Sequence, residues 1–172
     1  KTHQKVQAAT GFIGSTADGL TTTLGRGGSD YTAAILGAAL NASVIEIWTD
    51  VDGVLTADPR RVKKAFTLPS MTYREAMEMS HFGAKVIYPP TILPALAKGI
   101  PLRIKNTFNP TFEGTYIGEN PPEETLPPES DGGWGGAIKG ISSINQICLL
   151  TLQGSGMFGV PGIAARLFNA LA

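Results

Sequence analysis

A glycine-rich loop early in the chain carries residue types suited to binding an anion. The loop Gly25–Ser29 follows a predicted strand and stands directly before a helix-forming stretch. Glycines let backbone N–H groups approach a ligand closely, and the first N–H groups of a helix carry the positive end of its dipole. Arg26 adds a guanidinium that can hold a carboxylate or a phosphate through two hydrogen bonds. The loop matches neither the Walker sequence nor the G-x-G-x-x-G spacing, so an anion site and a plain turn both stay open.

A second polar cluster begins where a buried strand is expected to end. Thr49 and Asp50 come directly after the apolar run Val44–Trp48. Open α/β sheets bind their ligands at the carboxyl ends of their strands, so these two side chains are candidates for ligand contact. The pair Asp52-Gly53 that follows is more simply explained as a turn.

Cations stand at three separate loop ends. Arg60 comes directly after a proline, which fixes the backbone before it, and Lys85 follows a glycine at the end of an expected helix. With Arg26 they can spread the charge of a transferred phosphoryl group, while Asp30 and Asp50 can orient cations or bind Mg²⁺ through a nucleotide. The combination therefore favours phosphoryl transfer.

Composition excludes several other classes of function. The 172 residues include 14 Lys+Arg and 14 Asp+Glu, so no net positive charge draws the chain to nucleic acid or to an acidic membrane. No apolar run approaches the ~18 residues of a membrane span, and the chain does not open with a signal peptide. His3 and His81 have no partner at metal-ligand spacing, so we expect no metal bound directly by the chain. Cys148 lies in an apolar run and is expected to be a buried, inert thiol, as in a reducing cytoplasm.

Apolar periodicity predicts strands that alternate with helices. Thr72 and Glu75 have the spacing of a capping box, and Gly99 is expected to end a helix. The alternation indicates an α/β fold with a mainly parallel sheet and flanking helices. The predicted strands are Thr10–Gly14, Thr21–Gly25, Val44–Trp48 and Pro101–Lys105, and the predicted helices are Asp30–Ala42 with Ser29 as N-cap, Tyr73–Ser80 and Thr91–Lys98.

Composition also divides the chain into three parts. Residues 1–118 form the α/β part, residues 119–137 are a linker rich in proline, glycine and glutamate, and residues 138–172 begin a new unit. In that unit we expect a strand over Gln146–Leu152, a glycine loop, and a helix over Pro161–Leu171. The helix is expected to bury Ile163, Leu167, Phe168 and Leu171. The chain starts without methionine, which suggests a piece of a longer protein.

Four ordered motifs resemble the C-terminal half of an aspartate kinase catalytic domain. They are TTTLGRGGSDYTAA, IWTDVDGVLTADPR, EAMEMSHFGAKVIYPPT and IPLRIKNTFNP. This resemblance implies the amino-acid-kinase fold. After the linker, IKGISSINQICLLTLQGSGMFGVPGIAARLF resembles the first strand and helix of an ACT regulatory domain, a partial α+β module. The segments IKNTFNP and KGISSIN resemble the bifunctional aspartokinase–homoserine dehydrogenase type more than the lysine-sensitive single-function enzymes.

The resemblance also implies a role for each matching residue. Asp30 would organise the catalytic lysine, which belongs to a lysine-glycine-glycine-threonine-serine motif that this sequence lacks. Many relatives have tyrosine where this chain has Leu55, so the adenine contact differs. The implied aspartate-binding residues are Phe12, Arg26, Gly27, Gly28 and Ser29, the ATP-binding residues are Thr49, Asp50, Leu55, Arg60, Lys85 and Val86, and the effector-binding residues are Ser155, Gly156 and Met157.

The resemblance implies ATP-dependent phosphorylation of the L-aspartate side-chain carboxylate, with Mg²⁺ carried by the nucleotide. It further implies feedback by an amino acid, threonine before lysine, and a cytoplasmic homo-oligomer formed through the ACT region. Two alternatives stay open. The chain on its own could be a non-catalytic regulatory or assembly fragment, and the parent could be another amino-acid kinase acting on glutamate or a nucleotide.

Overall fold

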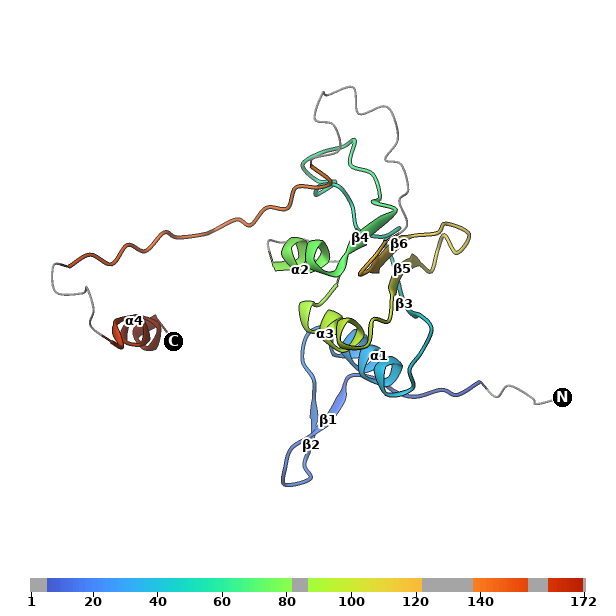
Figure 1. Ribbon diagram of the computed structural model, residues 1–172, viewed down its shortest axis with the longest axis horizontal. Coiled ribbons are helices and arrows are strands. Elements are labelled where there is room, and N and C mark those ends of the chain that lie inside the picture. The colour runs from blue at the N-terminus through green and yellow to red at the C-terminus, as the bar shows by residue number, and fades with distance from the viewer. Residues whose placement is uncertain (1–5, 82–86, 122–137, 155–160, 172) are drawn as a thin grey trace.

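The computed structural model describes residues 6–81, 87–121, 138–154 and 161–171. Along the chain, pairs of strands are separated by one or two helices (Figure 1). The helices are α1 (Gly28–Ala39), α2 (Tyr73–His81), α3 (Pro89–Lys98) and α4 (Ile163–Leu171), and the strands are β1 (Ile13–Ser15), β2 (Thr21–Thr23), β3 (Ile45–Thr49), β4 (Ser70–Thr72), β5 (Leu102–Asn106) and β6 (Thr115–Gly118).

The central sheet has the strand order β3-β5-β6-β4. β3 pairs with β5 and β4 pairs with β6 in parallel, whereas β5 and β6 are antiparallel. The predicted α/β fold is therefore confirmed, with a mixed, mostly parallel sheet. β1 and β2 form a separate antiparallel hairpin that projects away from this sheet (Figure 1).

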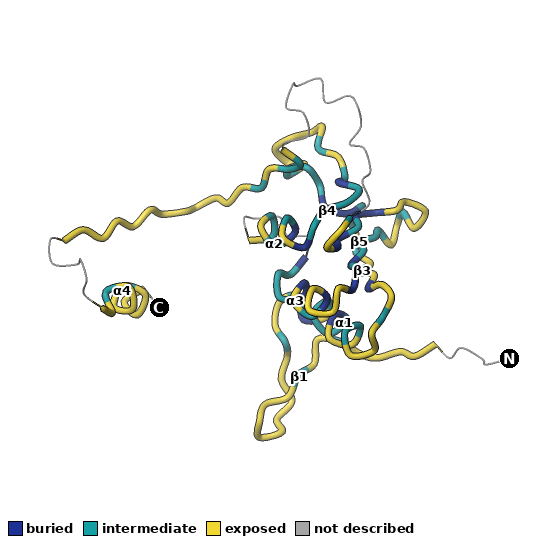
Figure 2. Tube along the Cα trace, viewed as in Figure 1, coloured by how far each residue is buried: buried dark blue, intermediate teal, exposed yellow. Residues whose placement is uncertain are grey.

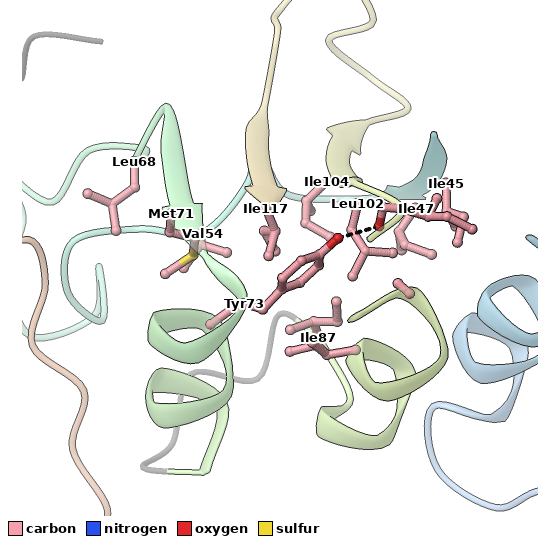
Figure 3. Close-up of a cluster of buried hydrophobic side chains, with 14 residues drawn as sticks. Ile45, Ile47, Val54, Leu68, Met71, Tyr73, Ile87, Leu102, Ile104 and Ile117 are labelled. Carbon is pink, nitrogen blue, oxygen red and sulfur yellow. Dashed lines mark hydrogen bonds between the residues drawn. The ribbon is translucent and has the colours of Figure 1, made fainter. Parts of the chain in front are cut away.

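The hydrophobic core lies between the sheet and helices α1, α2 and α3, which cover one side of it (Figure 3). Alternate residues of β3 are buried, while Glu46 and Trp48 face outward. The strand predicted at Val44–Trp48 is therefore half-buried, not fully buried. Tyr73 is buried in this core, and its hydroxyl donates a hydrogen bond to the carbonyl of Ile100 at 2.6 Å. That bond satisfies the one polar atom of the ring where water cannot reach it.

The residue before helix α1 approaches the residue before α3 closely because it is a glycine. Gly27, the residue before α1, has a φ of 71°, and a Cβ placed there would lie 2.4 Å from the Cβ of Tyr88. Tyr88 is the residue before α3. The backbone of Gly27 therefore packs directly on the side chain of Tyr88. Only glycine fits at residue 27, because it has no Cβ and adopts a positive φ without strain.

Helix α2 begins with the predicted capping box, which is confirmed. The N–H of Thr72 donates to Glu75 Oε2 at 2.7 Å, and the N–H of Glu75 donates to Thr72 Oγ1 at 3.1 Å. Lys139 Nζ lies 2.9 Å from Glu75 Oε1. The N–H of Ile141 also donates to the carbonyl of Thr56 at 2.7 Å. Residues 138–141, more than 60 residues further along the chain, therefore contact both the start of α2 and Thr56.

Several local predictions differ from the structure. The strand predicted at Thr10–Gly14 spans Ile13–Ser15, and the helix predicted to Ala42 ends at Ala39. Helix α1 begins at Gly28, so Ser29 lies inside the helix and is not its N-cap; the cap position has no side-chain hydrogen bond. The sequence analysis also missed β4 and β6, which have only three and four residues. Such short runs carry too little periodicity to be separated from loops. By contrast, Gly99 ends α3 in the left-handed conformation with a φ of 63°, as expected.

The C-terminal unit differs most from expectation (Figure 2). Residues 146–152 are exposed and form no strand, with a left-handed φ of 57° at Gln146, and Cys148 is exposed rather than buried. α4 forms, but it buries none of its residues; Phe168 and Leu171 are 68% and 57% exposed. A strand and an amphipathic helix bury their apolar faces only against a partner, and no described element covers these. No helix among the described residues is long and apolar enough to cross a membrane.

The carboxylate of Glu75 is expected to contribute to stability through its hydrogen bonds and its ion pair. Burial disfavours the charged form and is the largest single effect, but hydrogen bonds from Thr72 and Lys139 together hold the pKa of Glu75 below its usual 4.5. We expect Glu75→Ala to lower the free energy of unfolding by about 1–2 kcal/mol, measured by urea denaturation near neutral pH. Glu78→Ala, on the exposed side of the same helix, is the matched control.

The stability contributed by Glu75 should depend on pH, and the direction follows from its lowered pKa. A depressed folded pKa stabilises the protein above the unfolded value and loses that contribution as pH falls through the folded value. The difference between the parent and Glu75→Ala should therefore shrink between about pH 6 and about pH 3. A difference that stays constant or grows over this range would contradict the assignment.

The contact between Gly27 and Tyr88 gives a second test with a built-in control. Gly25 has a φ of 76° with nothing within 4 Å of its Cβ position, whereas Gly27 has a φ of 71° and meets Tyr88. We expect Gly25→Ala to destabilise the chain by about 1 kcal/mol, the cost of the left-handed conformation alone. Gly27→Ala should cost a further ~1–3 kcal/mol from the overlap. Equal unfolding free energies for the two variants would show that the helix contact is not tight.

Candidate functional site

The start of α1 presents unpaired backbone donors beside the glycine loop. The N–H of Gly28 donates to the carbonyl of Gly25 at 3.0 Å, and the N–H of Tyr31 donates to the carbonyl of Gly27 at 3.0 Å. Within the part of the chain that the structure describes, no hydrogen bond uses the N–H groups of Ser29 and Asp30. These two groups stand at the positive end of the helix dipole, where a carboxylate or phosphate binds well.

Phe12 lies against Gly28 of this loop. Its φ is 73°, a conformation that costs a bulky side chain energy. Hydrogen bonds hold it there: the N–H of Phe12 donates to Thr32 Oγ1 at 3.1 Å, and its carbonyl accepts from the N–H of Leu24 at 2.8 Å. A Cβ on Gly28 would lie 3.1 Å from the Phe12 ring, so the glycine allows the ring to approach the helix start.

Two charged side chains flank the donors. Arg26 is exposed, and its guanidinium makes no hydrogen bond or ion pair with any residue that the structure describes. Asp30 lies in the first turn of α1, where burial raises the pKa of its carboxyl, opposed by a hydrogen bond from Ser29 Oγ at 3.4 Å. The start of α1 therefore carries both an arginine that is free to bind an anion, Arg26, and a half-buried carboxyl group, that of Asp30.

Thr49 and Asp50 lie at the carboxyl end of β3, as predicted. The Thr49 hydroxyl donates to Asp50 Oδ1 at 3.1 Å. The Asp50 side chain is exposed beyond the strand, so its carboxylate can meet a ligand. β5, the parallel neighbour of β3, ends at Asn106 directly opposite Thr49.

Asp52 does more than form a turn. Its Oδ1 accepts hydrogen bonds from Asn106 Nδ2 at 2.8 Å and from Asn109 Nδ2 at 3.1 Å. The N–H of Thr107 donates to the carbonyl of Thr49 at 2.9 Å. The loop after β3 is thus joined to the loop after β5 at the sheet edge where Thr49 and Asp50 lie.

Arg60 sits in a hairpin whose base is held by backbone bonds between residues 54–56 and 66–68. The N–H of Leu68 donates to the carbonyl of Val54 at 2.8 Å, and Leu55 bridges to Thr67. The Arg60 guanidinium grips Asp58 with both Nε and Nη2, at 3.0 and 2.8 Å. Hydrogen bonds from the Arg60 side chain and backbone hold the pKa of Asp58 at about 2. The arginine side chain is 84% exposed, so its free face can receive an anion.

The structure brings together each of two groups of predicted site residues. Phe12, Arg26 and residues 27–30 meet at the start of α1, and Thr49 and Asp50 share the end of β3. No hydrogen bond or ion pair between described residues joins the two groups. Lys85, Val86, Ser155, Gly156 and Met157 lie outside the described residues.

No group of His, Cys, Asp and Glu that could hold a metal occurs among residues 6–81, 87–121, 138–154 and 161–171. A groove of about 440 Å³ lies between α2 and residues 138–140 and contains none of the predicted site residues. Its walls include Met71, Arg74, Met79 and Lys139.

Sequence reasoning missed the residues that hold the site in shape. Tyr88 packs on Gly27, Thr32 holds Phe12, and Asp58 holds Arg60. The spacing of Asp58 and Arg60 across a proline was the one available signal. The contacts of Tyr88 and Thr32 cross 61 and 20 residues of sequence, beyond any local pattern.

Curated relatives of high identity are aspartokinases. The chain is 48% identical over 168 residues to a bifunctional aspartokinase/homoserine dehydrogenase of Haemophilus influenzae, covering 98% of this chain and 19% of that protein. It is 42% identical over 165 residues to lysine-sensitive aspartokinase 3 of Escherichia coli, covering 94% of this chain and 34% of that protein. The chain thus spans about a fifth to a third of the length of these relatives.

A solved structure and a family profile agree with these relatives. Aspartokinase III of E. coli, in complex with aspartate and ADP, is 51% identical with a TM-score of 0.61, over 64% of this chain and 25% of that one. The profile of the Amino acid kinase family matches residues 2–106, which include the loop at α1, the end of β3 and the Arg60 hairpin. With this match over more than half of its length, the chain belongs to the amino acid kinase family.

Proposed function

We propose that the chain is part of an aspartate kinase, which transfers the γ-phosphoryl group of ATP to the side-chain carboxylate of L-aspartate. The observation that carries this proposal is the start of α1, where free N–H groups and an unpaired arginine surround one helix end. The E. coli structure that holds aspartate and ADP is 51% identical to the matched part of this chain, which supports both ligands.

The loop at α1 suits the acceptor amino acid. Aspartate carries two carboxylates, and one of them can accept from the N–H groups of Ser29 and Asp30 while Arg26 grips it with two parallel hydrogen bonds. The ring of Phe12, fixed beside Gly28, would close one side of this position. Asp30 would stay close to the reacting groups and orient the lysine that relatives supply from another segment.

The edge of the sheet suits the nucleotide. Thr49 and Asp50 stand at the carboxyl end of β3, where nucleotides bind in open α/β sheets. Arg60 is held by Asp58 with most of its guanidinium exposed, so it can meet a phosphate without first being ordered. Mg²⁺ would arrive with the nucleotide and supply charge neutralisation on the phosphates. Leu55 would give an apolar adenine contact.

The reaction balances without a covalent enzyme intermediate. An oxygen of the aspartate side-chain carboxylate attacks the γ-phosphorus, the bond from that phosphorus to the β,γ-bridging oxygen breaks, and ADP leaves with the electron pair. The products are 4-phospho-L-aspartate and ADP. Residues of this chain contribute positioning and charge to that step.

Regulation by an amino acid remains a proposal for residues 138–172. We place the effector at Ser155, Gly156 and Met157 and name threonine before lysine, because the sequence resembles the bifunctional enzymes. One relative is named as lysine-sensitive. Association of subunits through this region and a cytoplasmic location are part of the same proposal.

The first test is an acceptor assay. The full-length enzyme should form ADP when aspartate is present and not when glutamate or a nucleoside monophosphate replaces it.

The 172-residue chain alone should show no aspartate-dependent turnover, because the sequence lacks the lysine-glycine-glycine-threonine-serine motif. Threonine and lysine added separately to the same assay identify the effector. If the isolated chain turned over ATP with aspartate and Asp30→Ala abolished that activity, the proposal that catalysis needs a lysine from another segment would be wrong.

The second test separates the two ligand sites. Arg26→Ala should lower kcat/KM for aspartate, and Arg60→Ala should lower kcat/KM for ATP, each by about tenfold to a hundredfold. This is the loss expected for charge-assisted hydrogen bonds of roughly 1.5–3 kcal/mol. Each variant is the control for the other, because both remove one exposed guanidinium. If Arg26→Ala damaged ATP use and left aspartate use intact, the two assignments would be reversed.

A further inference from the structure

Asp52 stands next to the proposed nucleotide contacts and has partners that a simple turn does not need. The inference below rests on the proposed nucleotide role of Thr49 and Asp50. Asp52 comes three residues after the end of β3, and Asn109 comes three residues after the end of β5. Since β3 and β5 are parallel neighbours, both residues extend beyond the same edge of the sheet.

The Asp52 carboxylate collects two amide donors at one oxygen. Asn106 Nδ2 lies 2.8 Å and Asn109 Nδ2 lies 3.1 Å from Asp52 Oδ1. The orientation of the Asn106 amide is fixed independently, because its Oδ1 accepts the N–H of Phe108 at 2.9 Å. A flipped amide would lose both bonds at once. All three side chains are half-buried, where hydrogen bonds to a charged acceptor are stronger than in water.

These bonds hold the short segment from Thr49 to Asp52 at both of its ends. At the first end, the carbonyl of Thr49 accepts the N–H of Thr107 at 2.9 Å, which extends the β3–β5 ladder by one bond. At the second end, the side chain of Asp52 is tied to the β5 loop. Asp50 lies between the two ties, so its exposed carboxylate projects from a backbone with little freedom.

We propose that Asp52 is a positioning residue for ATP, which fixes Thr49 and Asp50 in the geometry that meets the nucleotide. Asp52 acts through the backbone of this segment and does not itself contact ATP. Without these hydrogen bonds, the backbone from Thr49 to Asp52 would be less restricted, and the side chains of Thr49 and Asp50 would adopt several orientations. The consequence is weaker nucleotide binding with little effect on the acceptor amino acid.

The experiment compares Asp52→Ala, Asp52→Asn and the control Asp18→Ala in the full-length enzyme. Asp18 is an exposed acid in the turn between β1 and β2 and controls for loss of one negative charge. For each protein, KM for ATP, KM for aspartate and kcat are measured, and Kd for ADP is measured by calorimetry without acceptor. Circular dichroism on heating reports whether each variant folds.

Asp52→Ala should raise KM for ATP and Kd for ADP by about tenfold or more, the scale of two lost bonds to a charged acceptor. KM for aspartate should change by less than about twofold. Asp52→Asn keeps an oxygen that can accept both amides and should restore most of the affinity, to within about threefold of the parent. If Asp52→Ala does not fold, Asn109→Ala removes one of the two bonds and should give a smaller rise in the same direction.

Other outcomes overturn the inference or separate it from the proposed function. Equal increases in KM for both substrates, unchanged ADP binding, or no rescue by Asp52→Asn would remove Asp52 as a positioning residue for the nucleotide. A parent enzyme that phosphorylates a different acceptor would overturn the proposed substrate, yet the shift in ADP affinity would still support this inference. A parent that binds no ADP would overturn both.

Discussion

The parallel pairing of β3 with β5 is the interaction on which the rest of the structure depends. Five consecutive residues of each strand are in register, from Ile45 opposite Leu102 to Thr49 opposite Asn106. One face of the pair buries Ile45, Ile47, Leu102 and Ile104, each contributing about 1.5–3 kcal/mol if fully buried. The same register brings the two carboxyl ends to one edge. Burial on one face therefore fixes which polar residues meet at the end of the strands.

The two candidate binding positions are shaped by different physical means. At the start of α1, two glycines lack side chains that would block their neighbours. Tyr88 packs on the backbone of Gly27, and the Phe12 ring packs on the backbone of Gly28. The strained φ of Phe12 is held by a hydrogen bond from its N–H to the Thr32 hydroxyl and by one from the Leu24 N–H to its carbonyl. At the end of β3, added hydrogen bonds to Asp52 restrict the loop instead. Close packing leaves the helix donors open to an anion, whereas the Asp52 bonds direct exposed side chains outward.

Two predictions from local signals at helix ends are confirmed, whereas one local prediction and those that needed a distant partner are wrong. The capping box of Thr72 and Glu75 and the left-handed Gly99 are chemistry within a few residues, and both are confirmed. Ser29 is not an N-cap because the left-handed Gly27 takes that position and α1 already begins at Gly28. The strand predicted at residues 146–152 failed for another reason: apolar alternation describes a face, and a strand exists only when another strand pairs with it. The exposed Cys148 follows from the same missing partner.

Composition and contacts divide the chain at different places. The change to proline, glycine and glutamate predicts a linker over residues 119–137, most of which lies outside the described residues. Beyond it, Lys139 and Ile141 bind Glu75 and Thr56, residues of the first part. Glu75 therefore serves two purposes with one carboxylate: it caps α2 through Thr72 and holds a segment 64 residues away through Lys139. Because both bonds are stronger to the ionised form, the start of α2 and the ion pair of Lys139 depend on the same proton, while Ile141 is held separately by the carbonyl of Thr56.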